Sequence, residues 1–543
     1  MMINLKCLYV VILVFKTIDA SIDPASYFPD QQTLGYAGPT EIGAEPSLIK
    51  SPFQPILQSH FPILNQNPTD SNATKIGSSA SSSVVDDVNR LPRIYRWGNL
   101  SPMYSLPTKT FSNQIDSGPE IPCGCELEQV HLVHRHGGRY PTTGSALPSF
   151  GKRIKEAQDS RKLKAKGVLD FLNTWSYELG TEVLTPFGRS QMFDLGISYR
   201  QKYGYLLNKM KDRIPVFRTT TQDRMYHSAL NFFAGFFGIP YEKSYHQSII
   251  IESQNFNNSL APYYQCPNSH HPGVGNLGSV VSEQWVESYL KNATHRFNEL
   301  IEGYQFTPSD LHTMQQVCSY ETIALGTSEF CSLFTDQEWL DYSYSIDLEF
   351  WYSNSFGNPT SAALGLGYTQ ELLARLTGRV DPNPSSSINT TLFNNPVTFP
   401  LNQSIYVDAT HDTVISTIVV ALNLTSLAAS GPLPTNRRDP KRSFRVEQIA
   451  PFGAQMATQI MTCQLQPNST QQKYARIVLN DAVIPLNGLS KCKSSNLGLC
   501  ELDLFIESLQ KRVQEIDYPQ SCFNNFTKPV PINSLGLTNG RWI

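Results

Sequence analysis

Three short strand-like segments, widely separated in the chain, constrain the fold more than any other feature of this sequence. Residues 129–134 alternate apolar and polar side chains, and residues 214–220 and 404–407 form two further apolar runs. Each run is accompanied by arginine or histidine side chains at its end. In an open α/β sheet the carboxyl ends of parallel strands gather at one edge, where ligands bind. We therefore expect a fold in which the three ends meet.

Helical patterns occupy most of the sequence between these strands. Thr185-Pro186 supplies an N-cap followed by a first-turn proline, and a further helix begins at Asp223. Residues 311–325 and 337–351 have the clearest amphipathic period. The sequence therefore predicts an α/β fold in which a central sheet is flanked by helices and carries a helical insertion.

A hairpin is predicted in the C-terminal third. Residues 475–479 and 482–486 are two apolar runs, and Asn480-Asp481 stands between them. Asn and Asp tolerate the left-handed backbone that a two-residue hairpin turn requires. We expect the chain to reverse direction there.

At 543 residues the chain is too long for one simple core and suits one large domain with an inserted or appended part. Residues 21–115 are rich in Pro, Ser and Asn, so we interpret them as an N-terminal arm and linker that straps over its own domain or over a second subunit. The remaining segments are a signal peptide at 1–20, the folded domain at 116–530 and a C-terminal tail at 531–543. Within the folded domain, an α/β core is expected at about 120–145, 185–250 and 400–530, and a helical part at about 146–184 and 251–399.

The N-terminus has the pattern of a secretory signal peptide. Lys6 precedes an apolar stretch, residues 7–15, that is too short to span a bilayer with ease, and small residues follow with a cleavage site after Ala20. An uncleaved signal anchor is the alternative. No later segment is apolar enough to cross a membrane, so we expect a secreted protein, extracellular or in a cell wall, with no membrane contact after signal removal.

The charge of the chain restricts its partners. The formal net charge is −3 and no run of Lys or Arg is present, which argues against nucleic acid. An anionic ligand must therefore meet local positive charge rather than a basic surface.

Two further features agree with secretion. Sequons for N-linked glycans stand at nine positions: Asn72, Asn99, Asn257, Asn292, Asn389, Asn402, Asn423, Asn468 and Asn525. The nine cysteines beyond the signal are dispersed and contain no CxxC pair, which favours disulfides over a metal site. Nine is odd, and Cys123 and Cys125 are too close to bond to each other easily. One of these two is therefore the leftover thiol or pairs between chains.

The segment Arg135-His136-Gly137-Gly138-Arg139 follows the first strand. The two glycines let the backbone turn sharply, and the arginines flank one histidine. Guanidinium forks bind phosphate oxygens two at a time and stay charged, so they offset the repulsion that a phosphate monoester presents to a nucleophile. A neutral imidazole then attacks phosphorus and forms a phosphohistidine that water cleaves, with no metal required. The alternative is an ordinary strand end with solvated charges.

Matching groups stand at the other two strand ends. Arg218 and Arg224 accompany the second strand, and His411-Asp412 follows the third. His411 would donate to a phosphate oxygen, and Asp412, kept protonated, would protonate the leaving alcohol. A His-Asp pair alone is more often structural, but the three segments together predict one site for a phosphate monoester.

These segments resemble the histidine acid phosphatase family, in its fungal, phytase-like branch. The family signature Arg-His-Gly-x-Arg-x-Pro is matched by residues 135–141, and its His-Asp pair by His411 and Asp412. The resemblance extends over about residues 92–530 and includes segments 184–188, 318–322, 334–339 and 480–485. It implies a phosphoglycerate-mutase-like large domain with an inserted, smaller α-helical domain.

The resemblance also implies a role for each residue of the site. His136 would be the nucleophile and Asp412 the proton donor, with no cofactor and no metal. The phosphate would be held by four side chains: Arg135, Arg139, Arg224 and His411. Arg218 would be a supporting or ion-paired residue, and we interpret His131 and His134 as packed or solvated rather than reactive.

By the same resemblance, eight cysteines would form four disulfides: Cys125–Cys463, Cys266–Cys522, Cys318–Cys331 and Cys492–Cys500. Cys123 would stay unpaired. Residues 97–102 resemble the N-terminal arm of the acid-phosphatase members, which implies a homo-oligomer strapped by such arms.

The expected substrates are small phosphate monoesters, with phytate among them. Family members specialised for phytate carry lysines shortly after the signature, whereas residues 142–148 contain no basic side chain here. A broad-specificity acid phosphatase is therefore favoured. The alternatives are a strict phytase, a phosphomutase, or a catalytically dead phosphatase scaffold at the cell surface.

Overall fold

The computed structural model describes residues 93–211, 213–467, 469–525 and 537–538, all within the compact unit Pro39–Ile543. The signal peptide, residues 21–92 of the arm and most of the C-terminal tail lie outside the described residues. The main sheet has eight strands: β1 (Cys125–Arg135), β3 (Val216–Thr220), β4 (His246–Ile250), β6 (Ile405–Thr410), β7 (Gln455–Cys463), β8 (Gln472–Leu479), β9 (Ala482–Ile484) and β10 (Cys500–Glu501).

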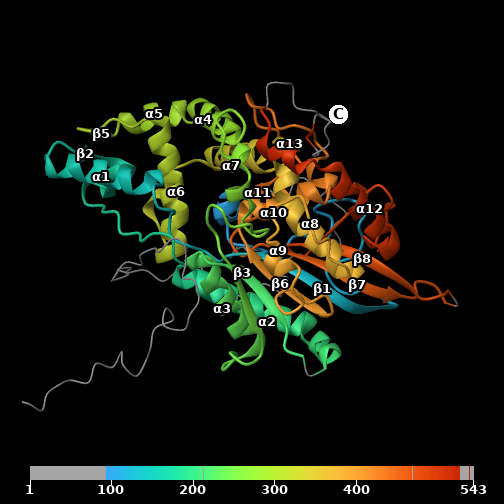
Figure 1. Cartoon of the computed structure of the whole chain (residues 1–543). Coiled ribbons are helices and arrows are strands. Elements are labelled where there is room, and N and C mark those ends of the chain that lie inside the picture. Colours follow the sequence, from blue (N-terminus) through green and yellow to red (C-terminus); the bar gives the residue numbers. More distant parts are fainter. Residues whose placement is uncertain (1–92, 212, 468, 526–536, 539–543) are drawn as a thin grey trace, which may run out of the picture. The chain divides into compact units, whose positions relative to one another are not determined.

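The strand order is β10-β8-β7-β1-β6-β3-β4, with β9 paired to β8 (Figure 1). β1, β6, β3 and β4 run parallel to one another, and β7 runs antiparallel to β1. The register places Arg135 opposite Thr410 and Arg218 opposite Asp408. The ends of β1, β3 and β6 therefore meet at one edge, as the sequence predicted.

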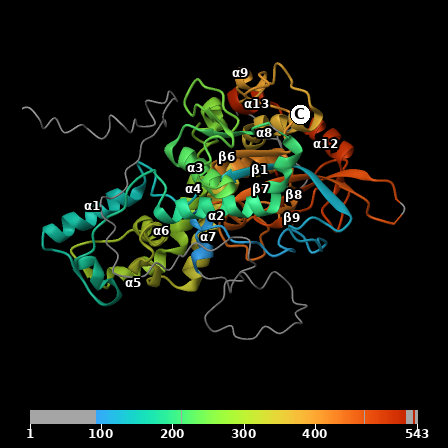
Figure 2. The ribbon, with the colours of Figure 1, turned by 90° about the horizontal axis from the view of Figure 1, so that it is seen from below.

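Helices cover both faces of this sheet (Figures 1 and 2). On one face α2 (Pro186–Tyr203) packs along α3 (Asp223–Phe237), which contacts β3 and β6. On the other face α10 (Asp412–Ala421) contacts β1, and α12 (Leu502–Glu515) contacts β8. Successive residues of β1 point into different cores, since Leu132 packs with the α2–α3 side and Val133 with the α10 side. The central strand is thus buried on both faces.

The helical part lies beside the sheet and carries most of the remaining helices (Figure 1). Its members are α1 (Ala146–Asp159), α4 (Leu277–Tyr289), α5 (Lys291–Asn298), α6 (Pro308–Leu325) and α7 (Asp336–Asn354), whereas α8 (Ser361–Thr377) packs against α10 and α12 over the sheet. Thr307 and Thr335 cap α6 and α7, each paired with an acidic residue three positions later. Three short helices complete the set: α9 (Thr390–Phe393), α11 (Val446–Ile449) and α13 (Tyr518–Phe523).

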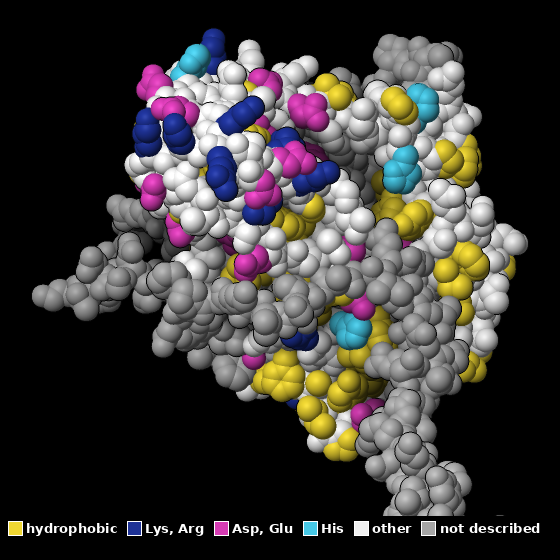
Figure 3. All heavy atoms as spheres, turned by 90° about the vertical axis from the view of Figure 1, so that its left-hand side faces the viewer, with side chains coloured by type: hydrophobic (Ala, Val, Ile, Leu, Met, Phe, Trp, Pro, Cys, Tyr) yellow, Lys and Arg dark blue, Asp and Glu magenta, His cyan; other side chains and the backbone are white. Residues whose placement is uncertain are grey.

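The outer surface of the helical part carries charges of both signs (Figure 3). On α1, Lys155 lies 2.8 Å from Asp159. Lys166 lies 2.9 Å from Glu302, which belongs to the small sheet of β2 (Lys164–Ala165) and β5 (Ile301–Glu302). These exposed pairs contribute little to stability. Among the described helices, none has both the length and the apolar character needed to cross a bilayer.

The hairpin between β8 and β9 is confirmed. Asn480 and Asp481 have φ angles of 47° and 68°, the left-handed backbone of a two-residue turn. Both side chains are also used, since Asp481 accepts from Ser105 at 2.7 Å and from Lys202 at 2.8 Å. The turn therefore anchors the N-terminal part of the chain.

The described end of the N-terminal arm, residues 93–106, is called the strap below. It lies on its own chain, where Arg93 and Arg96 contact Asp336 at the start of α7. Ser101 accepts from the backbone N–H of Phe452 at 2.8 Å. Gly98 has a φ of +56°, and a Cβ there would lie 2.5 Å from Ile346, so only glycine fits this bend.

Four disulfides join the eight cysteines in the pairs that the resemblance implied: Cys125–Cys463, Cys266–Cys522, Cys318–Cys331 and Cys492–Cys500. Cys123 is a free, exposed thiol. Cys125 and Cys463 stand directly opposite each other in the register of β1 and β7, which brings the two sulfur atoms within bonding distance.

The sequon asparagines differ in exposure. Four are exposed: Asn257, Asn292, Asn402 and Asn525. Three are partly buried, namely Asn99, Asn389 and Asn423. Asn423 donates its amide to the carbonyl of Gly488 at 2.5 Å, and the amide of Asn99 is used at the site described below. Asn72 and Asn468 lie outside the described residues.

Candidate active site

His136 stands directly after β1, at a turn with no spare room. A Cβ on Gly188, at the start of α2, would lie 1.8 Å from the carbonyl oxygen of Gly138. The backbone of the turn therefore touches the first turn of α2, which explains why glycines occupy both sides of this contact. His136 itself is 1% exposed.

The ring of His136 is held in one orientation. Its Nδ1 lies 2.8 Å from the carbonyl oxygen of Gly137, so Nδ1–H donates there and Nε2 keeps its lone pair. Burial lowers the pKa of His136 well below the usual value, and Arg135, Arg224 and Arg139 lower it further. The imidazole is therefore neutral, with an unprotonated Nε2.

Three arginines surround this histidine. Arg135 approaches Asp412 at 2.7 Å and lies over the ring of Phe452, 4.4 Å from its centroid. Arg139 donates to the hydroxyl of Tyr320 at 3.2 Å, and Arg224 is paired with Glu182. Each of the three arginines retains a buried Nε–H without a partner among the described residues. Unpaired guanidinium donors of this kind suit an anion with several oxygens.

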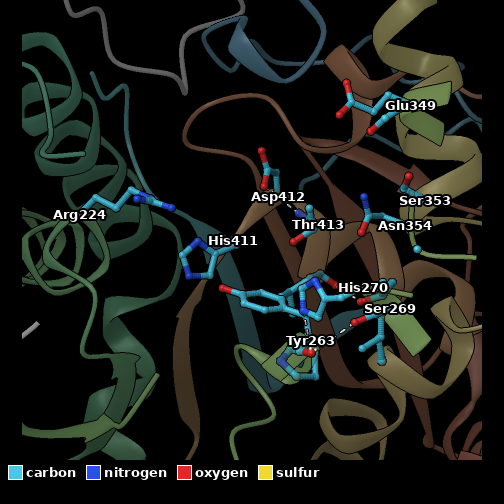
Figure 4. A pocket seen from close by; sticks show the side chains of 16 residues that line it. Arg224, Tyr263, Ser269, His270, Glu349, Ser353, Asn354, His411, Asp412 and Thr413 are labelled. Atoms are coloured by element: carbon cyan, nitrogen blue, oxygen red, sulfur yellow. Dashed lines mark hydrogen bonds between the residues drawn. The ribbon is translucent and has the colours of Figure 1, made fainter. Parts of the chain in front are cut away.

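His411 and Asp412 follow β6 and open α10. The His136 and His411 rings lie 5.9 Å apart between centroids, at an interplanar angle of 71°. Figure 4 shows the guanidinium of Arg224 directed toward His411. The structure thus brings together all six residues of the predicted site, from the end of β1 and the turn after it, from the start of α3 and from the residues that follow β6.

Glu252 belongs to the site and was not predicted. It lies two residues beyond β4 and accepts from Thr220 at 2.5 Å and Tyr263 at 2.6 Å, with Nε2 of His411 3.0 Å away. Burial opposes ionisation of this carboxyl, but His411 and the hydrogen bonds outweigh burial and lower the pKa of Glu252 to about 2. Glu252 is thus a carboxylate that orients His411. Recognition of β4 in the sequence would have placed it at this edge.

Asp412 differs from the sequence-based expectation of a protonated acid. Burial raises its pKa, but Arg135 and the side-chain amide of Asn99 outweigh burial and lower the pKa of Asp412 to about 2. The protein's own groups therefore hold Asp412 as a carboxylate. Protonation has to accompany an incoming anion, which would share Arg135 and add negative charge nearby.

A cavity of about 370 Å³ opens beside these groups (Figure 4). Its lining includes Arg224, Tyr263, Glu349, His411 and Asp412, and it contains no lysine among the described residues. Burial raises the pKa of Glu349 to about 7, with Asp412 and Glu283 raising it further. Glu349 was not predicted, because nothing in the sequence shows which face of α7 turns toward the sheet edge.

The other histidines and arginines of these strands are structural. Arg218 pairs with Asp408 at 2.6 Å and with Glu371 at 2.8 Å, in agreement with an ion-paired residue. His131 is stacked on Tyr406 and His134 on Phe232, and both histidines are fully buried. Neither histidine reaches the site.

Known proteins are similar to this chain in sequence and in fold. A model of the histidine phosphatase superfamily (branch 2) matches residues 126–480. "Phytase A" of Aspergillus fumigatus is 32% identical over 431 residues, 76% of this chain and 87% of that protein. "Phytase A" of Neurospora crassa is 28% identical over 512 residues, 82% of this chain and 94% of that protein. The crystal structure of the phytase from D. castellii has a TM-score of 0.65 and 28% identity, covering 83% of this chain and 93% of that one.

The matched region spans more than half of the chain and carries the whole constellation around His136. The chain therefore belongs to the histidine phosphatase superfamily, branch 2.

Proposed function

We propose that this phosphatase is a secreted acid phosphatase that transfers the phosphoryl group of a monoester to Nε2 of His136 and then to water. The observation that carries the proposal is a buried, neutral imidazole among three arginines, each with an unpaired buried Nε–H. The arginines and His411 hold the phosphate oxygens, and charge that develops in the transition state is met by groups already in place.

In the first step Nε2 of His136 forms a bond to phosphorus while the P–O bond to the leaving group breaks. Asp412 gives its proton to that oxygen, so an alcohol leaves rather than an alkoxide. In the second step water attacks the phosphohistidine, the P–N bond breaks, and the Asp412 carboxylate takes the proton of the water. Inorganic phosphate leaves, and both side chains return to their starting states.

The proton on Asp412 is supplied under acid conditions. A phosphate monoester has a second pKa near about 6, so below that pH the substrate arrives as a monoanion that carries a proton. Its negative charge beside Arg135 raises the pKa of Asp412 from about 2. We therefore expect activity at acid pH and a decline at higher pH, as the monoanion is lost and Asp412 in the substrate complex loses its proton.

The cavity supports a broad monoesterase over a strict phytase. Its described lining has no lysine to meet further phosphates. Phytate remains among the proposed substrates because relatives are named as phytases. The ratio of kcat/KM for p-nitrophenyl phosphate and phytate across acid pH tests this, and a strong preference for phytate would overturn it.

The mechanism is tested by trapping the intermediate. Rapid acid-free quenching with labelled substrate should leave an acid-labile, base-stable phosphate on His136, insensitive to chelators throughout. His136→Ala should abolish both the label and turnover, whereas His271→Ala, a matched change of an exposed histidine, should leave both intact. Retained turnover in His136→Ala contradicts the mechanism, and an inactive native protein would favour a catalytically dead scaffold.

Secretion and assembly belong to the same proposal. A signal peptide at residues 1–20 predicts that the mature chain begins after Ala20, which N-terminal sequencing of protein from culture medium would show. We propose a homo-oligomer strapped by N-terminal arms, as the resemblance of residues 97–102 to the arm of the acid-phosphatase members implies, although the strap contacts its own chain. Deletion of residues 21–92 should then lower the mass measured by light scattering to that of a monomer.

A further inference from the structure

We propose that Asn99 is a positioning residue that holds the carboxyl group of Asp412, and that Asn99 therefore carries no glycan in the active enzyme although it heads a sequon. The inference rests on the proposed function, in which Asp412 gives a proton to the leaving group. It assigns to the N-terminal strap a part in the chemistry of the sheet edge.

Three side chains close a ring at this point. Nδ2 of Asn99 donates to Oδ2 of Asp412 at 2.9 Å, and Nη2 of Arg135 lies 2.7 Å from the same oxygen. The backbone carbonyl of Asn99 accepts from Nη1 of Arg135. The other oxygen of Asp412 accepts from the backbone N–H of Thr413 at 2.8 Å. Hydrogen bonds thus fix the orientation of both carboxyl oxygens of Asp412, and Asn99 of the strap donates one of these bonds.

The strap itself is firmly placed, so Asn99 is held against Asp412 rather than resting there loosely. Trp97 is 1% exposed, and Gly98 fits against Ile346 only because it lacks a side chain. Backbone hydrogen bonds link Ser101 and Met103 to Phe452, at 2.8 and 2.9 Å. Because the residues before and after Asn99 are held in place, the Asn99 side chain can fix the orientation of Asp412.

A glycan on Asn99 conflicts with this arrangement. The sugar of an N-linked glycan bonds to Nδ2, the atom that faces Asp412. The side chain of Asp412 is 13% exposed and that of Arg135 is 0% exposed, so little space remains beside them. Asn292, on the exposed surface of α5, shows the contrasting case of a sequon with room for a glycan.

Leaving-group dependence separates a positioning role from a structural one. In Asn99→Ala, kcat/KM for an alkyl phosphate should fall by about tenfold or more, whereas p-nitrophenyl phosphate, which needs little protonation, should fall by less than about threefold. Loss of the amide donor also removes a contact that lowers the pKa of Asp412, so the basic limb of the pH profile should move to higher pH. Equal losses for both substrates with an unmoved limb would overturn the proposal.

Two matched variants complete the test. Ser105→Ala weakens the strap where it contacts Asp481, without touching Asp412, and should change neither the leaving-group dependence nor the pH limb. Asn99→Gln removes the sequon but keeps an amide, and should recover part of the alkyl phosphate activity that Asn99→Ala loses. Glycopeptide mass spectrometry should find Asn99 unmodified, and a glycan there in fully active enzyme would contradict the proposal. A native chain without phosphatase activity would instead contradict the proposed function itself.

Discussion

Two groups of buried arginines lie near β6. In only one of them is every arginine paired with a carboxylate of the chain. Near the middle of the strand, Arg218 uses Nε for Asp408 and both Nη atoms for Glu371, at 2.6 to 2.8 Å. Arg375 also pairs with Asp408, at 2.7 Å. Two cations therefore face two carboxylates, and the charge of this group is balanced by the chain itself.

Beyond the end of β6 there are more arginines than carboxylates paired with them. Arg135 is paired with Asp412 and Arg224 with Glu182. The hydrogen-bond partners of Arg139 among the described residues are neutral oxygens, those of Tyr320 and Tyr140. Two of the three guanidinium groups are thus paired with a carboxylate and the third is not, because the remaining carboxylate of the site, Glu252, contacts His411 instead. Burial is nearly the same in both groups, so burial does not mark the site. The guanidinium without a carboxylate partner marks it, since a phosphate would supply such a partner.

Substitution of an arginine in the fully paired group should change the stability of the fold. Arg218→Met leaves Asp408 and Glu371 buried without their main partner, so we expect the free energy of unfolding to fall by about 3–5 kcal/mol. Urea titration at neutral pH measures this change. KM and the inhibition constant for inorganic phosphate should stay the same in the folded fraction, and weakened phosphate binding at unchanged stability would break the comparison.

Substitution of the unpaired arginine in the second group should change catalysis. Arg139→Met removes a cation that has no paired carboxylate, so we expect kcat/KM to fall by about 10²- to 10³-fold. The free energy of unfolding should change by less than about 1 kcal/mol, because no buried charge is left alone. A large loss of stability in this variant would show that Arg139 is a structural cation after all.

Acid titration sharpens the comparison further. The pKa of Glu252 is lowered from 4.5 to about 2 in the fold, so its contribution to stability is complete above pH 4.5 and is lost as the pH falls through 2. We expect Glu252→Gln to be less stable than the native chain at pH 6 by up to about 3 kcal/mol, with the gap closing toward pH 2. Chemical denaturation at pH 6, 4 and 2.5 measures the gap, and a gap independent of pH would refute the assignment.

The smallest effect is expected at Glu349, which lines the cavity and forms no ion pair with an arginine of the described residues. Its pKa is raised to about 7, so ionisation above that pH adds repulsion against an anionic substrate. Glu349→Gln should lower KM for phytate by a few-fold at pH 7, with little change at pH 4, where the native side chain is already neutral. KM measurements at the two pH values test this, with p-nitrophenyl phosphate as the less sensitive control.

Much of the active site was predictable, because its groups follow strands that the sequence reveals. β1, β3 and β6 each combine an apolar run with a charged end, and their parallel order follows from the fold class. β7 was not predicted, because Gln455–Cys463 is buried on both faces and shows no alternation. β4 is a short edge strand without a clear pattern, and Glu252 was missed along with it.

The residues supplied by the strap and the helical part were not predictable for a different reason. Tyr320 and Glu349 reach the site because α6 and α7 dock in one particular way, and no local pattern encodes docking. Glu182 adopts a φ of +64° in an irregular segment, and its partner is 42 residues away. Asn99 carried a misleading local signal, since its sequon indicates an exposed surface.

β1, which His136 follows, is joined at both ends to β7 or to the residues just before β7. A disulfide joins Cys125 to Cys463 at its start, and at its finish Arg135 and His136 exchange backbone hydrogen bonds with Ala454 and Gly453 at 2.8 and 2.9 Å. Neither end of β1 is therefore free to separate from the sheet. Amide hydrogen exchange should therefore be slowest along β1, and heat should destroy catalysis only at the temperature at which the whole domain melts.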